Sequence, residues 1–375
     1  MYNIAMIGAG RRVAPLAKQL IQSDDFQLTA ICDTDVELAQ KRFAEIENVN
    51  YYQDAKEMLE KEKLDGVFIG TRCSTHTQYA LLVGEYGIPM FLEKPVCTKE
   101  EDLEKLQTLL PMNHKVVVSF PLRMCRMTQC VKEIIDSGRI GKIEHIQAYN
   151  NVNYARGYYH KWYRDEEETG GLLLQKATHD FDYINYLLGD NKPMRVCAIK
   201  SKQIFKGDMP EGLRCKDCEK RETCPEGVNN INIIEGDPYE IKDFCCFAKD
   251  TGNEDSSSAI ILYESGMHVA YSQDFIVRRG AGKRGARLIS YDATLEFDFN
   301  TGEIKIYYHN EDRIETCHIG TSGMHFGGDD LLVKNFADVV RGKDVSYTDL
   351  VSGILSAKMC LMAKKSAERF LFCDI

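Results

Sequence analysis

Short apolar runs separated by amphipathic segments fill the first third of the chain. The runs lie at 4–7, 28–32, 66–70, 88–92 and 116–120, with a further short strand near 49–52. Between them, apolar residues recur at helical spacing and predict helices near 13–21, 35–47, 54–63 and 75–86, and one opening at a Thr98–Glu101 capping box. Buried strands that alternate with helices are typical of a doubly wound parallel sheet. We therefore predict an α/β, Rossmann-type domain over residues 1–122.

The pattern changes after a helix near 127–137. Apolar and polar residues then alternate in longer stretches, at 143–149, 195–205, 259–263, 268–277, 286–291, 294–299 and 303–308. Short turns join several of these, which favours a large, mostly antiparallel sheet interrupted by a helix near 171–188. We predict an α+β domain over 123–345, with a cysteine-containing insertion at about 206–240. Helices near 329–341 and 348–368 close the chain, and we expect the segment 346–375 to pack back on the first domain.

Composition agrees with a two-domain globular protein of 375 residues, because 44% of them are hydrophobic and 28% charged. The net charge of −10, with no basic stripe, argues against a nucleic-acid partner. Neither an 18-residue apolar run nor a charged leader occurs, so we expect no membrane span and a cytoplasmic location. Most of the fourteen cysteines, such as Cys32 and Cys360, lie in apolar stretches typical of buried thiols in a reducing compartment.

A glycine turn follows the first predicted strand. Gly8-Ala9-Gly10 matches two glycines of the G-x-G-x-x-G dinucleotide fingerprint, and Val13 occupies the third position. The second strand ends in Asp33, where a carboxylate accepts a hydrogen bond from a ribose 2′-hydroxyl and repels a 2′-phosphate. NAD is therefore favoured over NADP. We place Arg11 and Arg12 near the pyrophosphate, the alternative being solvated charges in a first helical turn.

The strand at 88–92 runs directly into Glu93-Lys94-Pro95. Proline cannot donate to a sheet, so the strand must end at Lys94, on a rigid turn. Ligands of doubly wound sheets gather at the carboxyl ends of strands, and Gly8, Asp33, Thr71, His76 and Lys94 all fall there. The alternative for Lys94 is an ordinary surface lysine at a strand end.

The helix near 171–188 opens with Gly170-Gly171 and carries polar residues within an apolar sequence. Gln175, His179 and Asp182 share one face by helical spacing, which indicates a wall facing a cleft. A lone helical histidine is also compatible with a structural role.

Three cysteines, Cys215, Cys218 and Cys224, lie in a polar loop with metal-ligand spacing. They predict a structural zinc or an iron–sulfur cluster, with a fourth ligand from Cys245, Cys246 or another subunit. The alternative is free thiols, or the remnant of a site that has lost a ligand.

Together these features resemble the Gfo/Idh/MocA oxidoreductase family over nearly the whole chain. The resemblance rests on the glycine turn, the Glu93-Lys94-Pro95 motif, Arg123 after the sixth strand and the Gly-Gly helix with His179. It implies a pyridine-nucleotide dehydrogenase acting on a sugar, cyclitol or derivative, with Lys94 and His179 flanking the hydroxyl that loses hydride. It also implies a cofactor loop at Thr71 and His76, cofactor contacts from Glu93 and Lys94, and a substrate-binding and oligomerisation role for the domain over 123–345.

Within this resemblance His179 is suited to act as general base, and Lys94 to stabilise the developing alkoxide. The family's usual aspartate four residues before the histidine is Gln175 here, and Lys176 follows it in a K-x-x-H-D-x-D pattern. Asp180 or Asp182 is a candidate to orient His179, and the division of proton transfer among Lys94, Lys176 and His179 stays open. The substrate-contact candidates are Arg123, Tyr154, Trp162, Arg164, Gln175 and Asp180.

Three functions are compatible with these residues. The first is an NAD-dependent dehydrogenase of sugars or cyclitols in carbohydrate metabolism. The second is a redox-neutral enzyme that cleaves or epimerises glycosides through a keto-sugar while holding NAD tightly. The third is a non-catalytic sensor of NAD and sugar. A large antiparallel sheet with one uncovered face also predicts a homodimer or homotetramer.

Overall fold

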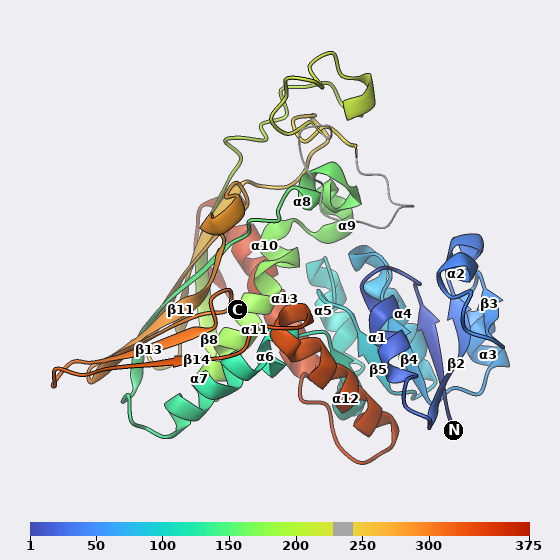
Figure 1. The fold of residues 1–375 in the computed structure, drawn as a ribbon, viewed down its shortest axis with the longest axis horizontal. Helices are drawn as coiled ribbons and strands as arrows, with labels where there is room; N and C mark the ends of the chain where they lie inside the picture. Colours follow the sequence, from blue (N-terminus) through green and yellow to red (C-terminus); the bar gives the residue numbers. More distant parts are fainter. Residues whose placement is uncertain (228–242) are drawn as a thin grey trace. The chain divides into compact units, whose positions relative to one another are not determined.

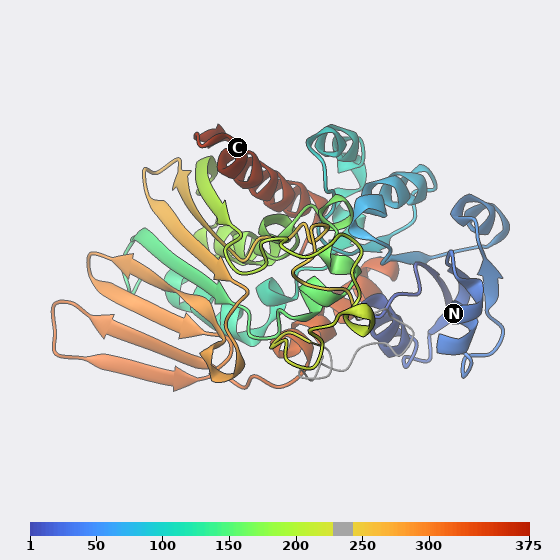
Figure 2. The same ribbon diagram turned by 90° about the horizontal axis from the view of Figure 1, so that it is seen from above.

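The computed structural model of the protein describes residues 1–227 and 243–375 and divides into two compact units (Figures 1 and 2). The first contains Met1–Cys125 and Gly323–Lys358. The second contains Arg126–Ser322 and Met359–Ile375. The predicted cysteine insertion at about 206–240 lies partly outside the described residues.

The first unit is built on a six-stranded parallel sheet in the order β3-β2-β1-β4-β5-β6. Its strands are β1 Tyr2–Ile7, β2 Phe26–Cys32, β3 Asn50–Tyr52, β4 Gly66–Ile69, β5 Met90–Leu92 and β6 Val116–Val118. Its helices are α1 Val13–Leu20, α2 Val36–Arg42, α3 Ala55–Lys61, α4 His76–Glu85, α5 Glu100–Gln107, α6 Pro121–Met124 and α12 Gly328–Val340. Short 3-10 turns lie at Cys73–Thr75, Leu110–Lys115 and Met324–Gly327. The predicted doubly wound sheet is confirmed.

Helix α12, from near the end of the chain, completes the core of this unit. The ring of Phe336 lies 4.9 Å from that of Phe68 on β4 and 5.8 Å from that of Phe91 on β5. All three side chains are fully buried, so α12 covers strands that precede it by more than 200 residues.

The predicted capping box at Thr98 is wrong. Helix α5 begins at Glu100 after Lys99, and no side chain caps its first turn. Thr98 is buried instead, and three acidic residues in the first turn, Glu100, Glu101 and Asp102, favour the helix through its dipole.

The second unit carries a nine-stranded sheet in the order β14-β13-β12-β11-β7-β10-β9-β8-β15. Within the described part of this sheet only β7 and β10 pair in parallel, so the predicted mostly antiparallel sheet is confirmed. The strands are β7 Ile143–Asn151, β8 Pro193–Ser201, β9 Ser256–Tyr263, β10 His268–Asp274, β11 Lys283–Ser290, β12 Ala293–Asp298, β13 Glu303–Tyr308, β14 Ile314–His318 and β15 Cys373–Asp374. The strand predicted to reach residue 205 ends at Ser201, and β14 and β15 were not predicted.

The helices assigned to this unit are α7 Arg126–Asp136, α8 Gly157–His160, α9 Glu166–Thr169, α10 Leu172–Gln175 and α11 Ala177–Leu188, and α13 Leu350–Arg369 spans the limit between the units. Short 3-10 turns lie at Trp162–Arg164, Cys215–Asp217 and Arg279–Ala281. Helix α11 is bonded to the sheet, because the Tyr263 hydroxyl donates to Asn185 at 2.8 Å.

Part of the sheet surface in the second unit is apolar and exposed. Ile199 on β8 is 61% exposed, and Ile260 on β9 is 51% exposed. Along β9 buried and exposed residues alternate, as expected for a sheet with one covered face. Within the described ranges, no helix has the length and apolar character needed to cross a membrane.

Candidate active site

The glycine turn after β1 has almost no room for side chains. Gly8 has a φ of +84°, and a Cβ atom there would lie 2.8 Å from the backbone of Gly70, after β4. A Cβ on Gly10 would lie 3.1 Å from the Gly70 carbonyl oxygen. Val13 fills the space that a side chain on Gly70 would need, 2.2 Å from the position of its Cβ. A glycine directly after a neighbouring strand thus makes room for the valine that stands at the third position of the fingerprint.

Asp33 is bonded to this turn. Its Oδ2 accepts a hydrogen bond from the Ala9 amide at 2.7 Å, and its Oδ1 accepts one from the Asp35 amide at 2.9 Å. Arg42 donates to the Ala9 carbonyl at 2.7 Å. A turn with two glycines, next to a carboxylate held directly after β2, fits a dinucleotide with a free ribose 2′-hydroxyl.

Arg12 is bound within the first unit rather than solvated, whereas Arg11 is exposed. The Arg12 guanidinium lies 3.0 Å from Glu93 Oε1, forms a two-point ion pair with Asp329 and donates to Ser119 Oγ at 3.2 Å. Burial opposes ionisation of Asp329, but His325 and Arg12 outweigh it and lower the pKa of Asp329 to about 2. Asp329 lies 317 residues from Arg12, and sequence reasoning missed it.

The Glu93-Lys94-Pro95 turn leaves β5 as predicted, with a cis Lys94–Pro95 peptide. Nδ1 of His76 lies 2.7 Å from the Pro95 carbonyl oxygen, and Nε2 lies 3.3 Å from that of Thr71. Burial lowers the pKa of His76, so a neutral ring donates its one proton, and the shorter contact is to Pro95. His76 is therefore bonded to the Lys94 turn through Nδ1, and its Nε2 lies beside the Thr71 loop.

Arg123 is also buried in the first unit. It donates to the carbonyl of Tyr347 at 3.2 Å.

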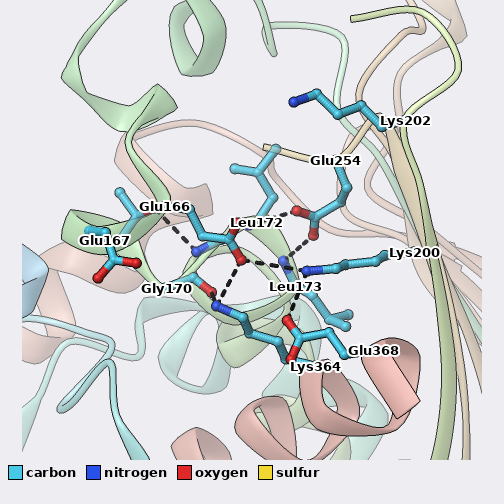
Figure 3. Close-up of polar contacts among 12 residues, drawn as sticks. Glu166, Glu167, Gly170, Leu172, Leu173, Lys200, Lys202, Glu254, Lys364 and Glu368 are labelled. Atoms are coloured by element: carbon cyan, nitrogen blue, oxygen red, sulfur yellow. Dashed lines mark hydrogen bonds and ion pairs between the residues drawn. The ribbon is translucent and has the colours of Figure 1, made fainter. Parts of the chain in front are cut away.

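The Gly-Gly helix of the second unit is two helices, α10 and α11, which meet at Lys176. Buried Glu254 accepts hydrogen bonds from the amides of Leu172 at 3.3 Å and Leu173 at 2.5 Å, at the start of α10 (Figure 3). Burial raises the pKa of Glu254.

Glu166, on the preceding helix α9, anchors the same region. It lies 2.7 Å from Lys364 Nζ and 3.5 Å from Lys200 Nζ, and Lys200 also lies 3.1 Å from Glu368 (Figure 3). Lys364 donates to the Gly170 carbonyl at 3.3 Å. These contacts fix the entry to the Gly-Gly helix.

Gln175, Lys176 and His179 are all at most 5% exposed. Lys176 Nζ donates to the Tyr154 hydroxyl at 2.5 Å and lies 4.7 Å from the centre of its ring. Tyr154, on the segment after β7, is 43% exposed. Lys176 and Tyr154 were predicted separately, as a catalytic and a substrate residue, and their pairing was not anticipated.

Asp180 is fully buried. It accepts hydrogen bonds from Arg284 Nε at 2.7 Å, Asn150 Nδ2 at 2.8 Å and the Tyr271 hydroxyl at 2.8 Å. Arg284, itself 6% exposed, was missed because it lies on β11, 104 residues away.

The other aromatic and basic candidates precede the Gly-Gly helix. Trp162 stacks on Tyr163 with ring centres 4.0 Å apart. Arg164 is 3% exposed and donates to Asp250 Oδ1 at 2.6 Å, with Phe244 beneath its guanidinium. Arg164 thus lies in a protein ion pair.

The predicted metal site gains no support. Burial raises the pKa of Cys245, and nearby Cys218 and Cys224 raise it further, so these thiols lie in one region. Nevertheless, within residues 1–227 and 243–375 no three or more His, Cys, Asp or Glu side chains form a group that could hold a metal ion.

Two family models match nearly the whole chain. An oxidoreductase model with an NAD-binding Rossmann fold matches residues 2–120, and its C-terminal α/β domain model matches residues 132–369. The chain belongs to the Gfo/Idh/MocA oxidoreductase family. The predicted resemblance is confirmed. The NAD-binding model covers the part of the first unit that contains its parallel sheet.

Three individual proteins illustrate the similarity, at sequence identities of 26% or lower. YteT of Bacillus subtilis, which carries the name of an oxidoreductase, is 26% identical over 94% of this chain and 92% of its own length. Myo-inositol 2-dehydrogenase of Thermotoga maritima is 24% identical over 50% of this chain and 55% of its own. A structure of levoglucosan dehydrogenase with NADH and levoglucosan has a TM-score of 0.76 at 17% identity and covers 100% of this chain and 99% of its own.

Proposed function

We propose that this chain is an NAD-dependent dehydrogenase of a secondary hydroxyl on a sugar, a cyclitol or a sugar derivative. One observation carries the proposal. This member of the family has both a glycine turn bonded to Asp33 and a buried Lys176–His179 segment. Relatives named for myo-inositol and for levoglucosan with NADH support the substrate class.

Gly8 and Gly10 let the backbone approach a pyrophosphate, and Asp33 accepts a hydrogen bond from a ribose hydroxyl. The same carboxylate repels a 2′-phosphate, so NAD is favoured over NADP. When bound, NAD accepts the hydride that leaves the substrate carbon.

In the proposed reaction Lys94 and His179 contact the reacting hydroxyl. The imidazole of His179 accepts its proton, because the unprotonated nitrogen of a neutral imidazole is a base. Lys94 donates a hydrogen bond to the alkoxide as negative charge develops. Arg12 and His76 act indirectly, because the first binds Glu93 and the second binds the Pro95 carbonyl.

A second candidate is the redox-neutral enzyme that passes through a keto-sugar and regenerates NAD. The pairing of Lys176 with Tyr154 favours it, because it supplies a second acid–base group besides His179. Simple dehydrogenation has only one hydroxyl proton to move.

The test is incubation with NAD and a panel of sugars, glycosides and cyclitols, with NADH followed by absorbance and products by chromatography. Accumulating NADH supports the dehydrogenase. Product without NADH supports the redox-neutral enzyme. The absence of both, with protein that binds NAD, refutes the two proposals.

A further inference from the structure

The Lys176–Tyr154 pair joins a buried ammonium to a partly exposed phenol. Lys176 is 5% exposed and Tyr154 is 43% exposed, and the two polar atoms are 2.5 Å apart. The Tyr154 side chain is therefore partly open to solvent, whereas its charged partner is largely shielded from water. Lys176 stands three residues before His179, at the junction where α10 ends and α11 begins.

Charged groups around the phenol favour its ionised form. Burial raises the pKa of Tyr154, but the positive charges of Lys176 and Arg284 and the hydrogen bond from Lys176 outweigh burial and the negative charge of Asp180. The pKa of Tyr154 is therefore below its usual value. Burial raises the pKa of the neighbouring Tyr158 instead, although Lys176 lies 5.3 Å from the centre of its ring. A phenol with this environment is a base at a lower pH than an ordinary tyrosine.

We propose that Tyr154 is a further catalytic residue, the base that removes a proton from the carbon next to the substrate's newly formed carbonyl, with Lys176 as its positioning residue. The C–H bond breaks and its proton passes to the Tyr154 oxygen. The electron pair forms a C=C bond to the former carbonyl carbon, and the carbonyl oxygen takes the negative charge.

Return of a proton to the same carbon restores the ketone. Return on the same face exchanges the hydrogen with solvent, and return on the opposite face inverts the configuration of that carbon. If the next carbon carries an O-linked leaving group, its C–O bond breaks and the electron pair goes to the departing oxygen, which takes the proton back from Tyr154 and leaves as an alcohol. The carbonyl then re-forms, and the C=C bond lies between the two carbons next to it. No oxidant is consumed in either case.

This inference rests on the proposed function, because it needs a ketone in this site. A keto-sugar or ketocyclitol has acidic C–H bonds beside its carbonyl, whereas the parent alcohol does not. In the proposed oxidation His179 accepts the hydroxyl proton, so a second base is available to accept a proton from carbon. Tyr154 and Lys176 have the arrangement that this role requires.

The experiment supplies the ketone directly. Wild-type protein with NAD⁺ is incubated in D₂O with 2-keto-myo-inositol or with methyl 3-keto-glucoside, and NMR follows deuterium entry beside the carbonyl. NAD⁺ cannot reduce the ketone, so exchange is measured apart from hydride transfer. We expect exchange above the buffer rate, and a loss of about 10²-fold or more in Tyr154→Phe. Lys176→Met should lose most of the exchange and Lys176→Arg should keep more of it.

Tyr291→Phe is the matched control, because it removes the same hydroxyl from a side chain that is 85% exposed. Wild-type exchange in Tyr154→Phe overturns the proposal, and so does the absence of exchange in the wild type with both ketones. Exchange without NADH formation from any alcohol refutes the dehydrogenase and leaves Tyr154 as the base. Equal loss of exchange and of single-turnover NADH formation in Tyr154→Phe overturns the separate role of Tyr154.

A second readout needs no turnover. The ultraviolet pH titration of the protein without NAD should contain one phenol that ionises below the usual value of about 10 and disappears in Tyr154→Phe. Identical titrations for wild type and variant contradict the proposed environment. If Tyr154→Phe fails to fold, the Lys176→Met and Lys176→Arg pair carries both measurements.

Discussion

Replacing Asp180 by asparagine should strongly destabilise the second unit. Asp180 is fully buried, with Arg284 on Oδ1 and both Asn150 and Tyr271 on Oδ2. Asparagine has one acceptor oxygen, so its NH₂ group must face either Arg284 or the other two donors. It also leaves a guanidinium that is 6% exposed without its opposite charge. Removing one partner of a buried ion pair costs about 3–5 kcal/mol, and we expect a loss near 3 kcal/mol because one oxygen remains.

The assay is denaturant unfolding of Asp180→Asn beside a matched control, Asp374→Asn. Asp374 also binds an arginine Nε, that of Arg195 at 2.6 Å, but the two side chains are 78% and 56% exposed. An exposed pair contributes about 0–1 kcal/mol, so the control should unfold almost like the wild type. Equal losses in the two variants, or a loss below about 1 kcal/mol for Asp180→Asn, would refute the reasoning from burial.

Three further results are expected. The pKa of Asp329 falls from 3.8 to about 2 on folding, so its ion pairs stabilise the fold at pH values above 3.8. This stabilisation is lost as the pH falls through about 2. The difference in unfolding free energy between wild type and Asp329→Asn should therefore shrink by roughly 2 kcal/mol between about pH 6 and pH 2, and a constant difference contradicts this. Burial raises the pKa of Glu254 above 4.5, so the folded state binds this proton more tightly than the unfolded state does. The protonated carboxyl therefore contributes stability at low pH, and this contribution is lost as the pH rises through the raised pKa. The unfolding free energy of the wild type minus that of Glu254→Gln should decline as the pH rises above 4.5, and an increase in this difference speaks against a raised pKa. Finally, we expect a dimer or tetramer in sedimentation and a smaller species for Ile260→Asp, which places a charge on the exposed apolar sheet face; an unchanged mass excludes that face as the interface.

Strands β4, β5 and β6 of the first sheet were predictable because all their residues are buried and read as uninterrupted apolar runs. Strand β14 was missed because four of its five residues are exposed, which leaves no alternating pattern. The break at Lys176 also left no sequence signal, since every residue from Leu172 to Leu188 is compatible with one continuous helix.

The candidate site was predictable only where a residue follows a strand or belongs to a motif, as Lys94 and His179 do. Pairings between distant side chains were not predictable. Arg12 with Asp329, Tyr154 with Lys176 and Asp180 with Arg284 join residues that are far apart in the chain, and none repeats with a period. Val13 looked like a departure from the fingerprint, and only the structure explains it, through the space left by Gly70.

The most direct test of the proposed dehydrogenase is NADH formation by the wild type and by His179→Ala, with Lys94→Ala in parallel. The proteins are incubated with NAD and a panel that includes myo-inositol and glucosides, and absorbance follows NADH. We predict turnover of at least one compound by the wild type and a loss of about 10²–10⁴-fold in His179→Ala. Unchanged turnover in His179→Ala would contradict the assignment of the base, and a wild type that binds NAD but oxidises nothing in the panel would contradict the proposed function.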